Sequence, residues 1–229
     1  MKIRNLKKTL RDFTLSIDSL DLEIPRTYGL LGANGCGKST FLKLISGILK
    51  SDSGTIDYEG ISNRELTLVP QKPYLMKDTV ENNLLYPLKI RNIHNTNDAL
   101  EGFIDLAGLQ SLRKGYAPNL SSGEAQRLSL ARGLIFSPKL ILIDEVFSNM
   151  DVESQISFEN YILSNRGGSR TTYIIISHQL AVIKRLCEQT IFMDNGRILA
   201  FGPTEEMLNN PTHPTLKNYI SFLEGGTIS

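Results

Sequence analysis

Residues 32–39, with the sequence Gly-Ala-Asn-Gly-Cys-Gly-Lys-Ser, match the spacing G-x-x-x-x-G-K-[ST] in full. Glycines at this spacing let the backbone turn tightly and point several N–H groups at phosphate oxygens. In loops of this kind the lysine, here Lys38, reaches the β- and γ-phosphates, and the hydroxyl of Ser39 binds Mg²⁺. The sequence therefore predicts a nucleoside triphosphate site with Mg²⁺, formed by Gly32, Ala33, Asn34, Gly35, Cys36, Gly37, Lys38, Ser39 and Thr40.

Two acids, Asp144 and Glu145, follow the apolar run of residues 140–143. Acids at the end of a buried strand need a metal ion or a hydrogen-bonding partner. We expect Asp144 to hold Mg²⁺ through water, and Glu145 to polarise a water for in-line attack on the γ-phosphate. A strand end that simply reaches solvent would give the same pattern. The phosphate loop in the same chain favours the catalytic interpretation.

These side chains need strands and helices at defined places to position them. Residues 28–31 are a short apolar run before the loop, and apolar positions recur at helical spacing over residues 41–49 after it. The unbroken apolar runs at 140–143 and 173–176 predict strands covered on both faces, as in a parallel sheet. Apolar residues alternate over residues 13–24, which predicts half-buried strands of an antiparallel sheet.

A long helical stretch lies between the two chemical motifs. Residues 79–132 are mostly helical in pattern, with expected breaks at Pro87, Gly115 and Pro118. The predicted fold class is α/β, with a RecA-like P-loop NTPase core that carries an N-terminal antiparallel β subdomain. The core would comprise residues 1–71 and 133–229, and an inserted helical subdomain would comprise residues 72–132.

The C-terminal part carries two weaker signals. Asp194-Asn195-Gly196 between apolar runs predicts a β-hairpin. From Pro203 onward the pattern indicates a short helical segment, which Pro211 and Pro214 would interrupt.

Composition narrows the class of protein. The 229 residues fit one large domain with an insertion, and 25 basic against 24 acidic residues give a net charge of +1. That balance argues against a large basic face, so we expect no nucleic-acid partner. The apolar runs are strand-sized, far below the roughly 20 residues of a spanning helix. We see no signal peptide, and two cysteines make no disulfide framework, so the expected compartment is the cytosol.

Six short motifs in a fixed order resemble the ATP-binding-cassette (ABC) ATPase family. Residues 120–132, LSSGEAQRLSLAR, are similar to that family's signature, LSGGQ followed by Q-R-x-x-x-A-R. The phosphate loop, Gln71, the signature, the acidic strand, Asp151 and His178 follow in the family's order. The resemblance covers essentially the whole chain.

The resemblance implies a role for each matching residue. Gln71 would touch Mg²⁺ and the attacking water, and His178 would contact the γ-phosphate and hold the water and Glu145. Ser121 and Gly123 would contact the γ-phosphate of an ATP held by a second subunit, through a backbone nest at a helix start. The dimer interface would comprise Ser121, Ser122, Gly123, Glu124 and Asp151. In isolation, His178 would be interpreted as a core histidine and Gln71 as a loop amide.

An N-terminal aromatic usually stacks on adenine in this family, and Phe13 is the nearest candidate. Because Phe13 also belongs to the alternating apolar segment, a core position is the competing interpretation. Cys36 lies in the loop beside Lys38 and a helix start, which favour the thiolate, so we expect a reactive thiol that ATP protects. Cys187 would be a buried, inert residue.

The chain also departs from the family pattern. Ser122 stands at the usual second glycine of the signature and Glu124 at the usual glutamine. Val146 and Phe147 stand where Pro-Thr usually follows the glutamate, and Met150 stands where leucine is usual. The side chain of Ser122 would lie near the phosphate of the other subunit and slow the ATPase. The chemical residues all match the family.

The resemblance implies an ATPase subunit that pairs, as a homodimer or heterodimer, around two ATP molecules. It would drive a separate transmembrane permease from the cytoplasmic face of the membrane, with a substrate-binding protein as a further partner. Import of a small solute is expected, and parts of the chain resemble importers of inorganic ions such as phosphate and tungstate. The alternatives are a soluble, non-transport ABC ATPase acting on DNA or ribosomes, and a slow ATP-dependent switch.

Overall fold

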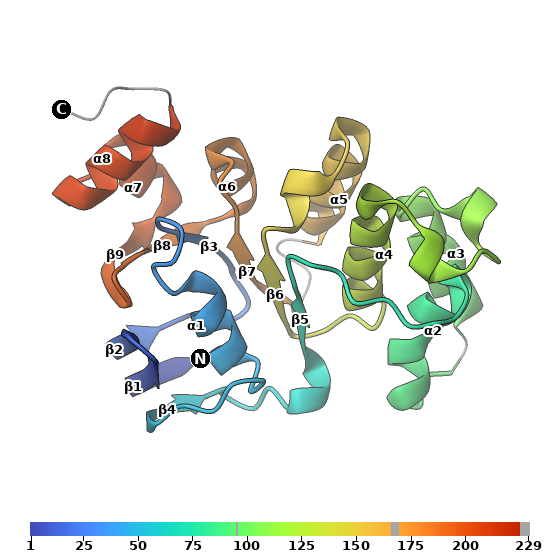
Figure 1. The fold of residues 1–229 in the computed structure, drawn as a ribbon, viewed down its shortest axis with the longest axis horizontal. Helices are drawn as coiled ribbons and strands as arrows, with labels where there is room; N and C mark the ends of the chain where they lie inside the picture. Colours follow the sequence, from blue (N-terminus) through green and yellow to red (C-terminus); the bar gives the residue numbers. More distant parts are fainter. Residues whose placement is uncertain (95, 166–169, 225–229) are drawn as a thin grey trace.

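The computed structural model describes residues 1–94, 96–165 and 170–224, which form two sheets and the helices around them (Figure 1). The larger sheet has six strands in the order β5-β6-β7-β3-β8-β9. The first five strands run parallel, and β9 pairs antiparallel with β8. The strands are β3 (Thr27–Leu31), β5 (Leu66–Val69), β6 (Leu140–Asp144), β7 (Thr172–Ile176), β8 (Gln189–Asp194) and β9 (Arg197–Pro203).

Three of these strands confirm the predicted parallel sheet. Every residue of β3, β6 and β7 is buried. Their unbroken apolar sequences fit this position, because strands covered on both faces have no solvent face to mark with polar residues. The predicted α/β class is thereby confirmed.

The smaller sheet is antiparallel, in the order β2-β1-β4. Its strands are β1 (Lys2–Leu10), β2 (Phe13–Asp21) and β4 (Ser53–Asp57). The antiparallel sheet was predicted, but β1 was missed because its apolar residues do not alternate regularly with polar ones. Asn5 has a left-handed φ of 47°, and the pairing with β4 shifts between Arg4 and Lys7. This shift is a β-bulge, and it places the buried residues Ile3 and Leu6 three positions apart in the sequence instead of two.

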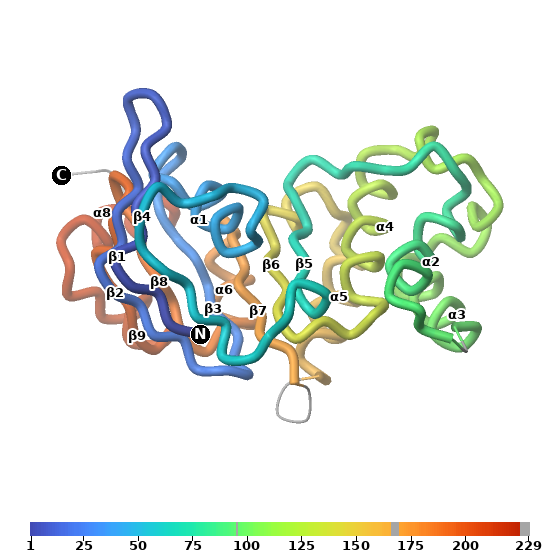
Figure 2. The backbone as a smooth tube through the Cα atoms, turned by 90° about the horizontal axis from the view of Figure 1, so that it is seen from below, coloured from blue at the N-terminus to red at the C-terminus, as the bar shows by residue number. Residues whose placement is uncertain are grey.

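Helix α1 (Lys38–Ile45) lies between the two sheets (Figures 1 and 2). Its buried residues Phe41, Leu42, Leu44 and Ile45 join one hydrophobic cluster with side chains from both sheets. The cluster therefore fixes the helix that follows the phosphate loop relative to both sheets.

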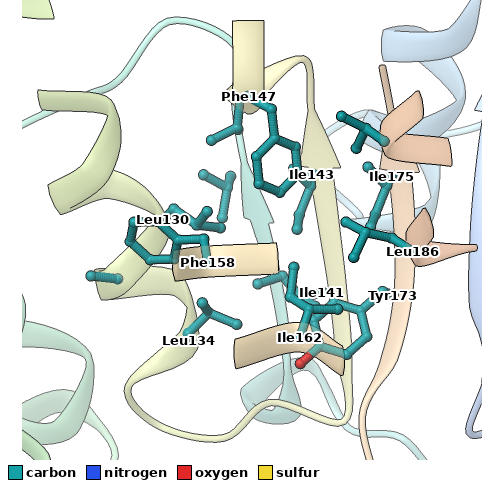
Figure 3. Close-up of a cluster of buried hydrophobic side chains, with 14 of the residues drawn as sticks. Leu130, Leu134, Ile141, Ile143, Phe147, Phe158, Ile162, Tyr173, Ile175 and Leu186 are labelled. Atoms are coloured by element: carbon teal, nitrogen blue, oxygen red, sulfur yellow. The ribbon is translucent and has the colours of Figure 1, made fainter. Parts of the chain in front are cut away.

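The opposite face of the larger sheet is covered by helices from the C-terminal half. They are α5 (Val152–Ser164), α6 (Leu180–Leu186), α7 (Thr204–Asn209) and α8 (Pro214–Leu223). Figure 3 shows part of this core, where Ile143 and Ile175 of the sheet lie among Phe147, Phe158 and Leu186. The sheet is thus packed on both faces.

Helices α2 (Val80–Ile90), α3 (Asn97–Leu106) and α4 (Ser122–Leu134) lie together beyond β5, away from the antiparallel sheet (Figures 1 and 2). Gly115 and Pro118 fall between α3 and α4, as predicted. The predicted break at Pro87 is wrong, because Pro87 lies inside α2. Two short 3₁₀ helices lie between α3 and α4, at Gln110–Leu112 and Ala117–Asn119. Two others lie outside this region, Asn63–Glu65 before β5 and Val146–Asn149 after β6.

The C-terminal hairpin is confirmed, with Asn195 and Gly196 at left-handed φ values of 44° and 74° between β8 and β9. The tail differs from the single interrupted segment expected from Pro203. It forms two helices, because Pro214 is the first residue of α8, where its missing N–H costs nothing. Among the described residues, no helix is both long and apolar enough to cross a membrane.

The topology gathers the predicted chemistry at one edge. Parallel strands present their carboxyl ends on the same side of a sheet, and loops there form crevices. The phosphate loop follows β3, Glu145 follows β6, and His178 comes two residues after β7. Gln71 comes two residues after β5. Four separate segments therefore meet at this edge.

Candidate functional site

The phosphate loop joins β3 to α1, and two of its glycines are sterically required. A Cβ on Gly32 would lie 2.2 Å from the carbonyl oxygen of Met193. A Cβ on Gly37, whose φ is 110°, would lie 2.7 Å from Cζ of Phe13. The loop is therefore enclosed by the C-terminal hairpin on one side and Phe13 on the other.

Lys38 is bound by the loop that carries it. Its Nζ donates to the carbonyl oxygens of Gly32 at 2.7 Å and Ala33 at 3.1 Å, and the residue is only 6% exposed. These carbonyls hold the ammonium in the loop, and no carboxylate in the described part of the chain forms an ion pair with it. An anion entering the loop therefore meets a positive charge that no acid has neutralised.

Glu145 has both carboxylate oxygens engaged. Gln71 Nε2 donates to Oε2 at 2.7 Å, and Nε2 of His178 lies 2.8 Å from Oε1. The backbone of Glu145 is left-handed, with φ 52°, and its N–H donates to the carbonyl of Ile176. The conformation is uncommon for a residue with a side chain, and such strain concentrates at functional sites. The structure thus brings the three predicted residues Gln71, Glu145 and His178 into direct contact.

Asp144 lies below this group and is 7% exposed. Burial raises the pKa of its carboxyl group, and a hydrogen bond from the Ser39 side chain opposes that rise. Its Oδ1 atom is buried with no hydrogen-bonding partner among the described residues. An unpaired, desolvated carboxylate oxygen beside a serine hydroxyl is suited to a hard cation such as Mg²⁺.

The described residues contain no cluster of three or more His, Cys, Asp and Glu side chains that would make a closed metal site. Mg²⁺ commonly binds through one or two protein oxygens together with substrate phosphates and water. Ser39, Asp144 and Gln71 fit such an open site.

A pocket of about 480 Å³ opens above the loop. It is large enough for a nucleotide, since small-molecule pockets range over about 300–1,000 Å³. Phe13 is half-buried and lines its wall. Its lining contains most of the predicted residues: Phe13, Asn34, Gly35, Gly37, Lys38, Ser39, Thr40, Gln71, Glu145 and His178.

Four of the predicted residues that belong to the phosphate loop or adjoin it do not line the pocket. Gly32 and Ala33 form the turn that holds Lys38, and Asp144 lies beneath Ser39. Cys36 corrects a prediction, because it is 5% exposed and packs against Gly32. The expected solvent-open thiol is thus contradicted, and burial also raises the pKa of the thiol against the opposing effect of Lys38.

The signature residues lie elsewhere in the chain, at the start of α4. Ser121 is the N-cap, and Ser122, Gly123 and Glu124 form the first turn. None of them lines the pocket over the phosphate loop. A single chain therefore does not bring the signature and its own phosphate loop into one site.

Asp151 has intramolecular partners that the sequence did not predict. It caps α5 through the N–H of Ser154 at 2.8 Å, and Nη1 of Arg127 lies 2.7 Å from its Oδ2. Because Arg127 lies on α4, the ion pair ties the signature helix to the segment after the acidic strand. No local signal in the sequence marks this contact, because Arg127 lies six positions after the cap Ser121 and Asp151 caps a different helix.

Sequence analysis also missed the support behind the loop. The N–H of Gly196 donates to the carbonyl of Cys36 at 2.9 Å. The hydroxyl of Tyr219, on α8, is buried close to the backbone of Gly32, and its ring lies 5.4 Å from that of Phe192. These residues are more than 150 positions from the loop in the chain, and no short motif marks them.

Comparisons with known proteins show the family of this chain. The family model described as ABC transporter matches residues 15–148. The tungstate uptake system ATP-binding protein TupC of Peptoclostridium acidaminophilum is 35% identical over 204 residues, covering 86% of this chain and 95% of that protein. The methionine import ATP-binding protein MetN of Staphylococcus saprophyticus is 30% identical, covering 93% of this chain and 67% of that protein.

Two solved structures share the fold at 20% identity. A structure described as the ATP-binding subunit of an ABC transporter has a TM-score of 0.84 and covers 97% of this chain and 98% of its own. A dimeric structure of a post-hydrolysis state of an ATP-binding cassette, bound to ADP and Pi, has a TM-score of 0.75 over 89% of this chain and 98% of its own.

Proposed function

Because this chain belongs to the ABC transporter family, we propose that it is an ATP-binding and ATP-hydrolysing subunit that powers transport through a separate membrane permease. One observation carries the proposal: Glu145, held by Gln71 and His178, faces the phosphate loop across one pocket. A nucleotide bound in the loop would then have its terminal phosphate beside this carboxylate.

The reaction follows from the positions of these groups. The backbone N–H groups of the loop and Lys38 bind the phosphates, with Lys38 exchanging its contacts to Gly32 and Ala33 for phosphate oxygens. A water between Glu145 and the γ-phosphate gives a proton to the carboxylate while its oxygen bonds to phosphorus. The bond to the β-phosphate oxygen breaks, and ADP carries away that electron pair.

Ser39, Asp144 and Gln71 would hold Mg²⁺, which would neutralise charge on the β- and γ-phosphates. The unpaired Oδ1 of Asp144 supports this assignment. Phe13 would stack on the adenine, because its half-buried ring forms one wall of the pocket and packs over Gly37.

We place the second half of each ATP site on another subunit. Ser121 and Gly123 lie apart from the loop of their own chain, so two copies facing each other would pair each loop with the other's signature. Ser122, Glu124 and Asp151 would lie along the same interface. The dimeric ATP-binding cassette that shares this fold supports the arrangement.

The permease would dock on the face formed by α2 and the segment after Gln71. A groove of about 510 Å³ lies there between the proposed helical subdomain, residues 72–132, and β5. Its rim carries large exposed apolar side chains, with Tyr74 77% exposed and Tyr86 46% exposed. Arg91 stacks on Phe136 within it at 3.7 Å. Apolar surface with a fixed cation suits a helix from a membrane protein.

Binding at this groove is tested by charge substitution. Tyr74→Asp with Tyr86→Asp is expected to abolish co-purification of the tagged chain with its permease from detergent-solubilised membranes, because the contact would desolvate both carboxylates. Phe222→Asp, at a 61% exposed position on α8, is the matched control and should retain the permease. Retention of the permease by the double variant would refute this docking site.

For the cargo, we propose import of an inorganic oxyanion such as tungstate, with the chain on the cytoplasmic face of the membrane. The support is the similarity to a tungstate uptake subunit over 95% of that protein's length. Cells lacking this chain are expected to lose most high-affinity tungstate accumulation, measured by elemental analysis, and to keep methionine uptake. Loss of methionine uptake alone would instead identify methionine as the cargo, as in the name of the MetN relative.

A further inference from the structure

Both donors of Ser121 are already occupied by Glu124. The Ser121 N–H donates to Oε2 of Glu124 at 2.8 Å, and the Ser121 hydroxyl donates to the same oxygen at 2.7 Å. In return, the N–H of Glu124 lies 3.4 Å from the Ser121 hydroxyl oxygen. This reciprocal capping box satisfies the first turn of α4 within the chain.

A hydroxyl has one proton to donate, and so has a backbone N–H. If Ser121 is to donate to the γ-phosphate of an ATP on a second copy, it has to release Glu124 first. The acceptor it releases is a charged one, because the two hydrogen bonds from Ser121 lower the pKa of the Glu124 carboxyl group. Charge-assisted bonds of this kind are about twice as strong as neutral ones.

The positive charge of Arg127 helps to lower the pKa of the Glu124 carboxyl group, but the hydrogen bonds of Arg127 go elsewhere. Arg127, one turn further along α4, directs Nη1 to Asp151 at 2.7 Å and Nε to the carbonyl of Ala107 at 2.8 Å. The γ-phosphate of a second copy would therefore approach a carboxylate as well as the Ser121 donors. Two like charges repel each other, and the repulsion grows as water leaves the interface.

We propose that Glu124 is a positioning residue that competes with the γ-phosphate of the second subunit for Ser121, and so sets the concentration at which ATP drives pairing. The proposal rests on the function proposed above. In the free subunit Glu124 accepts the hydrogen bonds from the N–H and the hydroxyl of Ser121, and its carboxylate leaves a negative charge at the signature. In the pair, either Glu124 turns away or the γ-phosphate is held without the Ser121 hydroxyl, and both outcomes weaken pairing.

The test uses Glu124→Gln in a Glu145→Gln background, where slow hydrolysis preserves the bound ATP. An amide oxygen still accepts from Ser121, so the cap and the thermal midpoint should be retained, but it carries no charge. We expect Mg-ATP-dependent dimerisation, measured by analytical ultracentrifugation, at a protein concentration about tenfold lower or more. ATP affinity of the monomer should be unchanged, since Glu124 does not line its own chain's pocket.

Two further measurements distinguish this role of Glu124 from an effect of net charge alone and from an effect of altered structure. Glu153→Gln removes the same charge from the exposed first turn of α5 and should leave the dimerisation midpoint within about twofold. Raising the salt concentration should favour pairing of the parent more than of Glu124→Gln, because salt screens the repulsion that the variant lacks.

The outcomes are distinguishable. An unchanged midpoint in Glu124→Gln, or an equal shift in Glu153→Gln, would overturn the competition while leaving the proposed pairing intact. Absence of ATP-dependent dimers in every variant would overturn the pairing, and the competition with it.

Discussion

Glu145→Gln is expected to cut ATP hydrolysis by about 10²–10⁴-fold, the usual contribution of a general base. The amide keeps the shape of the side chain and can still accept from Gln71 or His178, which lie 2.7 Å and 2.8 Å from the carboxylate oxygens. It cannot take a proton from water. ATP binding should therefore persist, and phosphate release in a steady-state assay should fall.

The matched control is Glu206→Gln, an exposed acid in the first turn of α7, which should hydrolyse ATP at the parental rate. Equilibrium binding of a fluorescent ATP analogue separates loss of catalysis from loss of binding. Parental turnover in Glu145→Gln would remove this residue from the role of base.

Lys38→Ala is expected to weaken nucleotide binding by about tenfold or more and to abolish measurable turnover. The loss of one charge-assisted hydrogen bond to phosphate accounts for a decrease in affinity of at least this size. The fold should survive, because Lys38 lines a pocket that water enters, and water can donate to the carbonyls of Gly32 and Ala33 in its place. Calorimetric titration with ATP and the far-ultraviolet circular dichroism spectrum measure the two effects.

Lys43→Ala provides the comparison, since Lys43 lies on the same helix and is exposed. Its ATP affinity should match the parent. Equal affinity in Lys38→Ala and the parent would mean that the backbone N–H groups of the loop alone bind the triphosphate.

Much of the fold was predictable where one local pattern decides the structure. The buried strands β6 and β7 contain the unbroken apolar runs 140–143 and 173–176, and Asn195-Gly196 permits one tight turn. Prediction failed where distant contacts override local preference. The bulge at Asn5 displaces the alternation of β1, and helix α2 continues through Pro87 while packing against α4.

The site shows the same division. The contact between Gln71, Glu145 and His178 could be expected from strand ends that share one edge of a parallel sheet. The burial of Cys36 could not, because it depends on how the distant hairpin and Tyr219 enclose the loop from behind. A motif specifies which residues meet the ligand, and tertiary packing determines which of its variable positions face inward.

The two hydrogen-bonded oxygens of Glu145 have a consequence for a cell that makes more of this subunit than of its permease. Each oxygen keeps a second acceptor position for water, and the two partners, Gln71 and His178, set the direction in which the carboxylate points. Gln71 begins the segment that leads to Tyr74 on the rim of the groove, so a bound permease could displace it. ATP consumption would then depend on how many copies of this subunit are docked on the proposed permease, and not on how many the cell makes.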